Sequence, residues 1–337
     1  GGRGRGGPER RRGGRGDTPP AIRPPVPSGM RYSGHEWFPC RYAWLPKAVR
    51  ALADDPGALR DTEGAVERLG IGKNMVRALV FWATAMGVIE ATDDGHAVTP
   101  FGAAVFGEGG LDPFLEDVRT LWLLHWRVAT TEDPLFAWDF LLNRWHRPEI
   151  VRSVVLPEFI REANSGARTY SETTLRQHFD VFMQVYTPVT RTRAGAGEDH
   201  LDSPLVELGL IETVGERVVG AKREPVYAFR REPRPEIPPA LFAVCLADYW
   251  RTHRAAERTL TFRDVAVAPG SPGQILKLPE ADVRDRLETI AADTDGVFGY
   301  QESAALAQAT RPDSTDVADP ALALDLLHRV YEPALVA

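Results

Sequence analysis

Apolar side chains recur along the first hundred residues with the spacing of short amphipathic helices. Ala48, Val49, Leu52 and Ala53 would share one face of a helix that begins near Pro46. A Gly-Ile-Gly turn at residues 70–72 precedes a second strongly periodic stretch, and Gly87 is placed to end it. The expected elements, in order, are a helix from Pro46, a short helix at Thr62–Leu69, a helix at Lys73–Met86, and a hairpin of residues 88–91 and 97–99 around the turn 93–96.

This order of helix, short helix, helix and hairpin is typical of a winged helix. Such a unit can place the start of its last helix in the major groove of DNA. Lys73, Asn74 and Arg77 lie at that end of the predicted helix, and their side chains suit contacts with phosphates, guanine or adenine. We therefore expect DNA binding here, although winged helices also serve as protein–protein modules.

Residues 112–187 are helical by pattern and rich in aromatic side chains. Their Trp and Phe stripe is interpreted as core rather than as a platform for stacking bases. The expected helices begin at Asp112-Pro113, at Asp133-Pro134, at Pro148 (running to Asn164) and after the capping residue Ser171 (running to Thr187).

A partial internal repeat follows, because residues 207–212 resemble residues 85–90. With the helix 171–187, the polar loop 188–203 and a strand at 226–229, it predicts a second winged-helix-like unit. The last third alternates between helix and strand. Its expected elements are a helix at Pro238–Arg254, strands at Leu260–Val267 and Gln274–Leu278, a helix at Pro279–Ala292, and a structural turn at residues 269–273, which no P-loop Lys-Ser/Thr follows.

The predicted fold class is mainly α with small β-hairpins, an α+β fold in four parts. The first part is a disordered Arg/Gly/Pro tail, because it has almost nothing to bury. The parts are residues 1–29 (the tail), 30–110 (a winged-helix DNA-binding domain), 111–235 (a helical domain with the second winged-helix-like unit) and 236–337 (a small α/β region).

Charge and cysteine content narrow the class of protein. The net charge of the 337 residues is −7, but residues 1–28 carry seven Arg against Glu9 and Asp17, which leaves −12 on the rest. A DNA-facing surface must therefore be a local patch. Cys40 and Cys245 are the two cysteines, which excludes a disulfide scaffold and favours a reducing cytoplasm. No apolar run approaches the roughly 18 residues that span a bilayer, so we expect no membrane association.

Two groups of residues could carry chemistry. In the segment 31–41, His35 and Glu36 precede a cluster of aromatic residues that could hold a proton-transferring or metal-binding pair rigidly. The alternative is that both are solvated loop residues before a helix. Glu116, Asp117 and His125 could bind a divalent metal ion, whereas the alternative is that the two acids complement a helix dipole.

The chain resembles a known family in three blocks of sequence. They are Ser33-Gly34-His35-Glu36 with Phe38-Pro39, Arg41-Tyr42, Trp44-Leu45 and Lys47; Leu69-Gly70 with residues 72–76, Trp82, Gly87 and Ile89-Glu90; and residues 115–117 with 121–126. Weaker matches extend the resemblance over about residues 32–310. These blocks are similar to the uncharacterised-domain family found in bacterial DNA phosphorothioation operons.

That resemblance implies a protein that cuts one strand of double-stranded DNA in phage defence. It further implies partners that install sulfur in the DNA backbone: a cysteine desulfurase, an ATPase and an adenylating sulfur-transfer enzyme. The alternatives are a non-catalytic winged-helix adaptor or regulator that recruits these partners to DNA, and a helical scaffold that contacts only proteins.

Hydrolysis of a phosphodiester needs an activated water and stabilised phosphate charge, commonly supplied by Mg²⁺ or Mn²⁺. We expect His35 and Glu36 to act as general base and metal ligand, in either assignment. Arg41 and Lys47 would then stabilise phosphate charge. Glu116, Asp117 and His125 are second-choice metal ligands, provided that their helix packs beside the loop 31–41.

Overall fold

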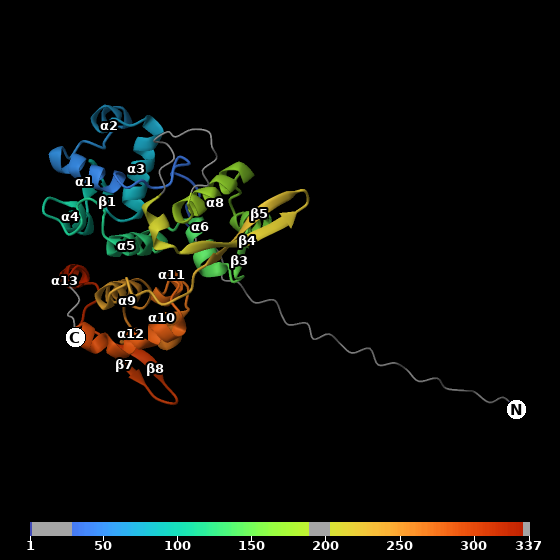
Figure 1. Ribbon diagram of the computed structural model, residues 1–337. Helices are drawn as coiled ribbons and strands as arrows, with labels where there is room; N and C mark the ends of the chain where they lie inside the picture. Colours follow the sequence, from blue (N-terminus) through green and yellow to red (C-terminus); the bar gives the residue numbers. More distant parts are fainter. Residues whose placement is uncertain (2–28, 189–202, 333–337) are drawn as a thin grey trace.

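The computed structural model describes residue 1 and residues 29–188 and 203–332 (Figure 1). The predicted Arg/Gly/Pro tail, apart from its ends, and most of the predicted polar loop 188–203 lie outside the described residues. The described chain combines many helices with three small antiparallel sheets, which confirms the expected α+β class.

The N-terminal elements follow the predicted order of helix, short helix, helix and hairpin. Asp61 caps the second helix through Gly64 N, Gly70 ends it in the left-handed conformation, and Thr99 caps the helix after the hairpin. The elements are α1 (Trp44–Asp54), α2 (Thr62–Leu69), α3 (Lys73–Ala85), β1 (Ile89–Thr92), β2 (Gly95–Val98) and α4 (Pro100–Phe106).

The middle of the chain is helical, as predicted, but two helices begin later than expected. Asp112 does not open a helix, because its carboxylate accepts the backbone N–H groups of Glu116 and Asp117 and so closes a turn. Residues 149–151 form a strand instead of a helical turn, because they pair with residues 226–228. The elements are α5 (Val118–Ala129), α6 (Phe136–Asp139), the π-helix η1 (Phe140–Arg144), β3 (Glu149–Val151), α7 (Arg152–Ala163) and α8 (Glu172–Tyr186).

The segment that resembles residues 85–90 again leads from a helix to a strand. Gly209 adopts the left-handed conformation that Gly87 adopts in the first copy, but the preceding helix is only the short 3-10 helix η3 (Pro204–Leu208). It is followed by β4 (Ile211–Val219) and β5 (Lys222–Phe229), which form a sheet in the order β3-β5-β4. The outer part of the β4–β5 hairpin projects from the body (Figure 1).

Both predicted strands of the final third differ from the observed structure. Only residues 259–261 pair as a strand, because Thr261 and Asp264 form a capping box that starts a helix. Ser271 and Pro272 begin another helix where Gln274–Leu278 is expected to be extended. The elements are α9 (Pro239–His253), β6 (Thr259–Thr261), α10 (Phe262–Ala266), α11 (Pro272–Ile275), α12 (Glu280–Asp293), β7 (Gly299–Glu302), β8 (Ala307–Thr310) and α13 (Pro320–Val330), with β6-β8-β7 as the third sheet.

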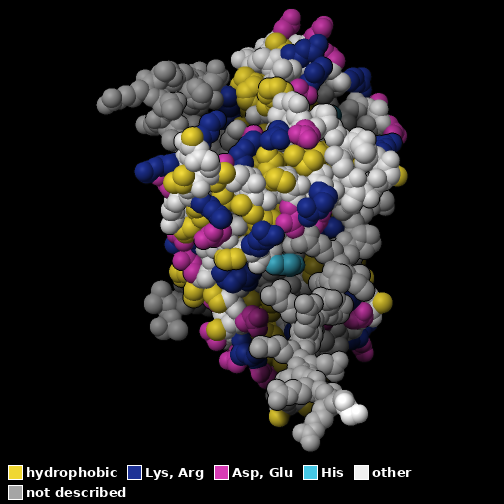
Figure 2. Space-filling view, turned by 90° about the vertical axis from the view of Figure 1, so that its right-hand side faces the viewer, with side chains coloured by type: hydrophobic (Ala, Val, Ile, Leu, Met, Phe, Trp, Pro, Cys, Tyr) yellow, Lys and Arg dark blue, Asp and Glu magenta, His cyan; other side chains and the backbone are white. Residues whose placement is uncertain are grey.

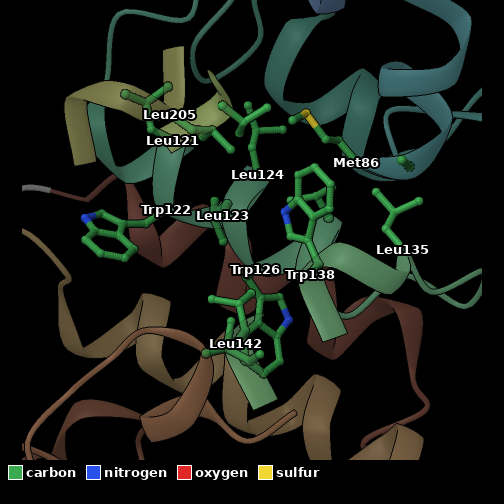
Figure 3. Close-up of a cluster of buried hydrophobic side chains, with 14 of the residues drawn as sticks. Met86, Leu121, Trp122, Leu123, Leu124, Trp126, Leu135, Trp138, Leu142 and Leu205 are labelled. Atoms are coloured by element: carbon green, nitrogen blue, oxygen red, sulfur yellow. The ribbon is translucent and has the colours of Figure 1, made fainter. Parts of the chain in front are cut away.

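One continuous hydrophobic core joins the predicted regions, and α5 runs through its centre (Figure 3). Trp122, Leu123 and Trp126 of α5 point in different directions, and all are almost fully buried. A helix that is apolar on every side is expected where the core surrounds it. This confirms the Trp and Phe stripe as core. Among the described helices, none has the length and apolar character to cross a membrane.

Candidate functional site

The loop of residues 31–41 is anchored at both ends to the rest of the molecule. Arg31 N donates to Pro134 O at 2.8 Å, and Arg31 O accepts from Phe136 N at 3.0 Å. The Arg31 guanidinium lies over the Phe81 ring of α3, 4.7 Å from its centroid. Near the other end, the Trp82 indole N–H donates to Phe38 O at 2.9 Å. The loop is therefore held against α3 and against the segment that leads into α6.

Three of the four residues 34–37 of this loop have positive φ. Gly34 has φ 115°, and a Cβ there would lie 2.7 Å from Phe81 Cδ2, so a side chain is excluded. Glu36 and Trp37 have φ 47° and 70°, which is unfavourable for residues with a side chain. The Trp37 side chain is nonetheless 65% exposed. Strained backbone that carries an exposed aromatic residue is a feature that concentrates at functional sites.

His35 is buried against a second histidine that is distant in sequence. Its ring is 2% exposed and lies parallel to that of His178 of α8, with Nε2 3.1 Å from His178 Nδ1. The edge of Phe81 packs against the His35 ring. The far nitrogen of His178, Nε2, accepts the backbone N–H of Ala137 at 3.0 Å. The site thus joins the loop, α3, α6 and α8.

Backbone N–H groups donate to the outer nitrogen at each end of the pair. Ala137 N donates to His178 Nε2 at 3.0 Å, and Trp37 N donates to His35 Nδ1 at 3.2 Å. These bonds fix the orientation of both rings.

Both histidines are neutral at pH 7. Burial, reinforced by the Arg31 charge, lowers the pKa of His35 to about 4. Burial, with His35 and Arg31 adding to it, lowers the pKa of His178 well below its usual value. The partner of Arg31 is accordingly the Phe81 ring and not a charged imidazole.

A small cavity of about 80 Å³ opens beside His35, and Glu36 is on its wall. Thr174 and Gln177 of α8 contribute polar groups to the opposite wall. Among the described residues Glu36 has no ion-pair partner, so its carboxylate is available to a ligand. The full lining is Tyr32, Ser33, Gly34, His35, Glu36, Trp37, Thr174 and Gln177.

Arg41 and Lys47 lie on the same unit but do not enter that cavity. The Arg41 guanidinium lies over the Phe38 and Trp44 rings, 5.6 and 5.5 Å from their centroids. The Lys47 ammonium donates to Leu69 O at 3.2 Å, which places it at the turn before α3. Lys47 therefore belongs with the α3 end rather than with His35.

The N-terminal end of α3 is exposed and cationic. Lys73, Asn74 and Arg77 are all exposed, and within residues 29–188 and 203–332 none of them makes a hydrogen bond or ion pair through its side chain. Gly72 caps the helix without a side-chain hydrogen bond, so the first-turn N–H groups also face outward. By contrast, on the face toward which the β4–β5 hairpin projects, Lys and Arg side chains are interspersed with acidic ones (Figure 2).

The structure does not gather Glu116, Asp117 and His125 into a group. Asp117 caps α5 and holds Arg119 in an ion pair, while Glu116 is exposed. His125 is buried, with one ring nitrogen on Tyr186 Oη at 2.8 Å and the other on Ile275 O at 3.0 Å. Both of its nitrogens are therefore occupied. Over the part of the chain that the structure describes, no three His, Cys, Asp or Glu side chains lie together as a metal site would need.

Sequence reasoning missed His178. Its position on the apolar face of α8, between Leu175 and Phe179, gives a signal that a polar group is buried there. That signal does not name the partner, which is 143 residues away.

The chain matches a known protein family over most of its length. The sequence profile of a family described as "Protein of unknown function (DUF4007)" matches residues 32–331. The chain belongs to this family. No curated protein matches the chain.

Two solved structures match closely in fold. One is a magnesium ion-bound crystal structure of SspB, with a TM-score of 0.76 and 27% identity over 88% of this chain and 87% of that chain. The other is a crystal structure of SspB with a TM-score of 0.73 and 28% identity over the same shares. The likeness covers most of this chain and most of each SspB chain, so they share the same overall fold.

Proposed function

We propose that this protein acts on DNA in a phosphorothioation system and nicks one strand of the duplex. The likeness to SspB over most of both chains supports a role in that system. The observation that carries the DNA contact is the exposed, unpaired cationic end of α3, in a unit whose order of elements is that of a winged helix.

The geometry allows one duplex to reach both parts of the site. Phe81, which contacts the His35 ring, lies eight residues after Lys73 on α3. Eight residues of α-helix span about 12 Å, roughly the width of a major groove. DNA held at the α3 end by Lys73 and Arg77, with Lys47 beside them, would thus pass near the loop 31–41.

We assign the chemistry to Glu36, with His35 as its support. The His178–His35 hydrogen bond and the burial of both rings hold the loop in its strained conformation, so the Glu36 carboxylate is preorganised at the cavity. Arg41 would stabilise phosphate charge from the other end of the loop.

A magnesium or manganese ion would be held here by one carboxylate together with waters and substrate phosphates. The described residues form no cage of several ligands, but Mg²⁺ is often held by one or two carboxylates, waters and substrate phosphates. Glu36, without an ion-pair partner, could supply the carboxylate. When bound, such an ion would polarise the phosphate and lower the pKa of a water molecule.

The test is conversion of supercoiled plasmid to open circle by the purified full chain with Mg²⁺ or Mn²⁺. Glu36→Gln should reduce the rate by about a hundredfold or more, a typical effect of losing a group that acts at the reacting centre. Glu67→Gln, at an exposed position on α2, is the matched control and should nick at the wild-type rate. Equal nicking by both variants would remove Glu36 from the site.

The second candidate function is a non-catalytic adaptor that recruits sulfur-transfer partners to DNA. The lack of a ligand cage in the described chain favours it. If the wild type binds duplex but shows no metal-dependent nicking above a mock preparation, the adaptor function holds. If the wild type does not bind duplex at all, both functions fail and the protein-only scaffold is left.

A further inference from the structure

A second cavity shares no lining residue with the cavity beside the loop 31–41. It has a volume of about 320 Å³ and is enclosed by α5, α9, α13 and Phe101 of α4. Most of its wall is apolar, formed by side chains such as Leu123, Val244, Leu326 and Leu327. This volume is at the lower end of the range for small-molecule sites, which are mostly apolar with a few polar groups.

One of those polar groups is the Arg127 guanidinium. It stacks on Phe101, with Cζ 3.8 Å from the ring centroid, and it fills the space above Gly87, where a Cβ would lie 2.5 Å from Arg127 Nη1. Within the described residues the Arg127 guanidinium makes no hydrogen bond, although the Asp248 carboxylate of the same wall attracts its charge. Burial lowers the pKa of Arg127 to about 10, so it is still charged at pH 7.

The other charged groups of the wall are already matched. One oxygen of Asp248 accepts the Trp126 indole N–H at 2.9 Å, and the other accepts from Arg251 at 2.6 Å. Asp319 is exposed at the rim and caps α13 through the N–H of Ala321. The single Asp248 carboxylate therefore acts on two guanidinium groups, and it accepts a hydrogen bond from Arg251 rather than from Arg127.

An arginine has five N–H donors, and Asp248 only partly compensates the charge of the half-buried Arg127 guanidinium. The side of the cavity that Arg127 borders can therefore take a further hydrogen-bond acceptor. We propose that this cavity binds a small ligand with an apolar body and one acidic group, a carboxylate or a phosphate. The acidic group pairs with Arg127, and the apolar body packs between α9 and α13.

The experiment measures binding of three six-carbon probes to the full chain by titration calorimetry: hexanoate, hexyl phosphate and the uncharged hexan-1-ol. Hexanoate or hexyl phosphate should bind about tenfold more tightly than hexan-1-ol, because a charge-assisted hydrogen bond to a partly desolvated arginine is strong. The tighter of the two acids identifies the acidic group.

Two variants test the charge of Arg127 and the volume of the cavity separately. Arg127→Met should bring the affinity for both acids down to that for hexan-1-ol. Ala247→Leu, which fills part of the cavity and keeps Arg127, should weaken all three probes together. Equal affinity of the wild type for all three probes, or binding of none, would overturn the proposal even if Arg127→Met does not fold. The proposal is independent of nicking, since it concerns a different part of the molecule.

Discussion

The loop 31–41 and the first turn of α3 lie on the same N-terminal unit and are built in opposite ways. In the loop, His35 is 2% exposed, and its neighbours Glu36 and Trp37 are held at positive φ. At the α3 end, Lys73 and Arg77 are exposed, unpaired and in regular helical conformation. The conformation of the loop depends on packing, whereas the α3 end is defined by its exposed positive charge.

Substitutions in the two regions should therefore impair the protein in different ways. A strained loop keeps its shape only because the surrounding core imposes it, so damage there should appear first as lost stability. A solvated helix end contributes little to stability, so damage there should appear as lost affinity for a polyanion. Stability and duplex affinity, measured on variants of each region, distinguish the two.

Acidification should destabilise the fold through the loop. In the unfolded chain a histidine takes up a proton near pH 6.5, whereas folded His35 does so only near pH 4. The unfolded state therefore binds more protons between these values, and the free energy of unfolding should fall as the pH falls. For His35 alone the loss is up to about 3 kcal/mol.

Denaturant unfolding at several pH values between 7 and 4 measures this loss. Buried His178 and His125, whose pKa values are also lowered by burial, add to it. His178→Phe should be less stable than the wild type at pH 7 and should lose less on acidification. A variant curve parallel to the wild type would contradict the assigned role of the pair.

Two glycines provide the sharpest contrast in stability. Gly34→Ala should cost roughly 2–3 kcal/mol, because the new Cβ meets Phe81 at 2.7 Å and φ is 115°. Gly72→Ala at the start of α3 meets nothing within 4 Å and has φ −64°, so it should change stability by less than about 1 kcal/mol. Thermal unfolding compares the two, and similar losses would argue against strain in the loop.

Substitutions at the α3 end should change the affinity for duplex DNA rather than the stability of the fold. Lys73→Ala/Arg77→Ala should weaken duplex binding by about tenfold and reduce the slope of log affinity against log salt by about two. Its melting temperature should stay near the wild-type value. Fluorescence anisotropy with a short duplex measures both quantities.

The control removes the same charge from the C-terminal region. Arg254→Ala/Arg258→Ala also deletes two exposed cations, each paired with a local acid. Its salt slope should equal that of the wild type. If the two double variants lose affinity equally, DNA binding follows total charge and the α3 end has no special part.

The smallest effect concerns the cap of α3. Gly72→Ser should stabilise the helix by a few tenths of a kcal/mol, about the usual difference between serine and glycine at an N-cap. Gly72→Asp should stabilise it similarly but weaken duplex binding, because it adds a negative charge where the phosphates are expected. Anisotropy on both variants checks this, and equal affinities would place DNA elsewhere.

Local sequence was enough to predict the N-terminal order of elements and the exposed α3 end. The apolar period of residues 76–86, the Gly-Ile-Gly turn and Gly87 act over a few residues, so the helix ends can be read from them. The late start of α5 was not predictable, since Asp112-Pro113 resembles a helix start and only the bonds to Glu116 N and Asp117 N show a turn instead.

The sequence alone predicts a core of aromatic helices, the cations at Lys73–Arg77 and the adjacent pair of His35 and Glu36. The contact of His35 with His178, the two partners of His125 and the cavity that Arg127 borders become visible only in the folded chain. The cause is the distance along the sequence over which each kind of interaction acts. Helix periods and caps depend on neighbours three or four residues away, whereas proton positions and buried charges depend on contacts across more than a hundred residues.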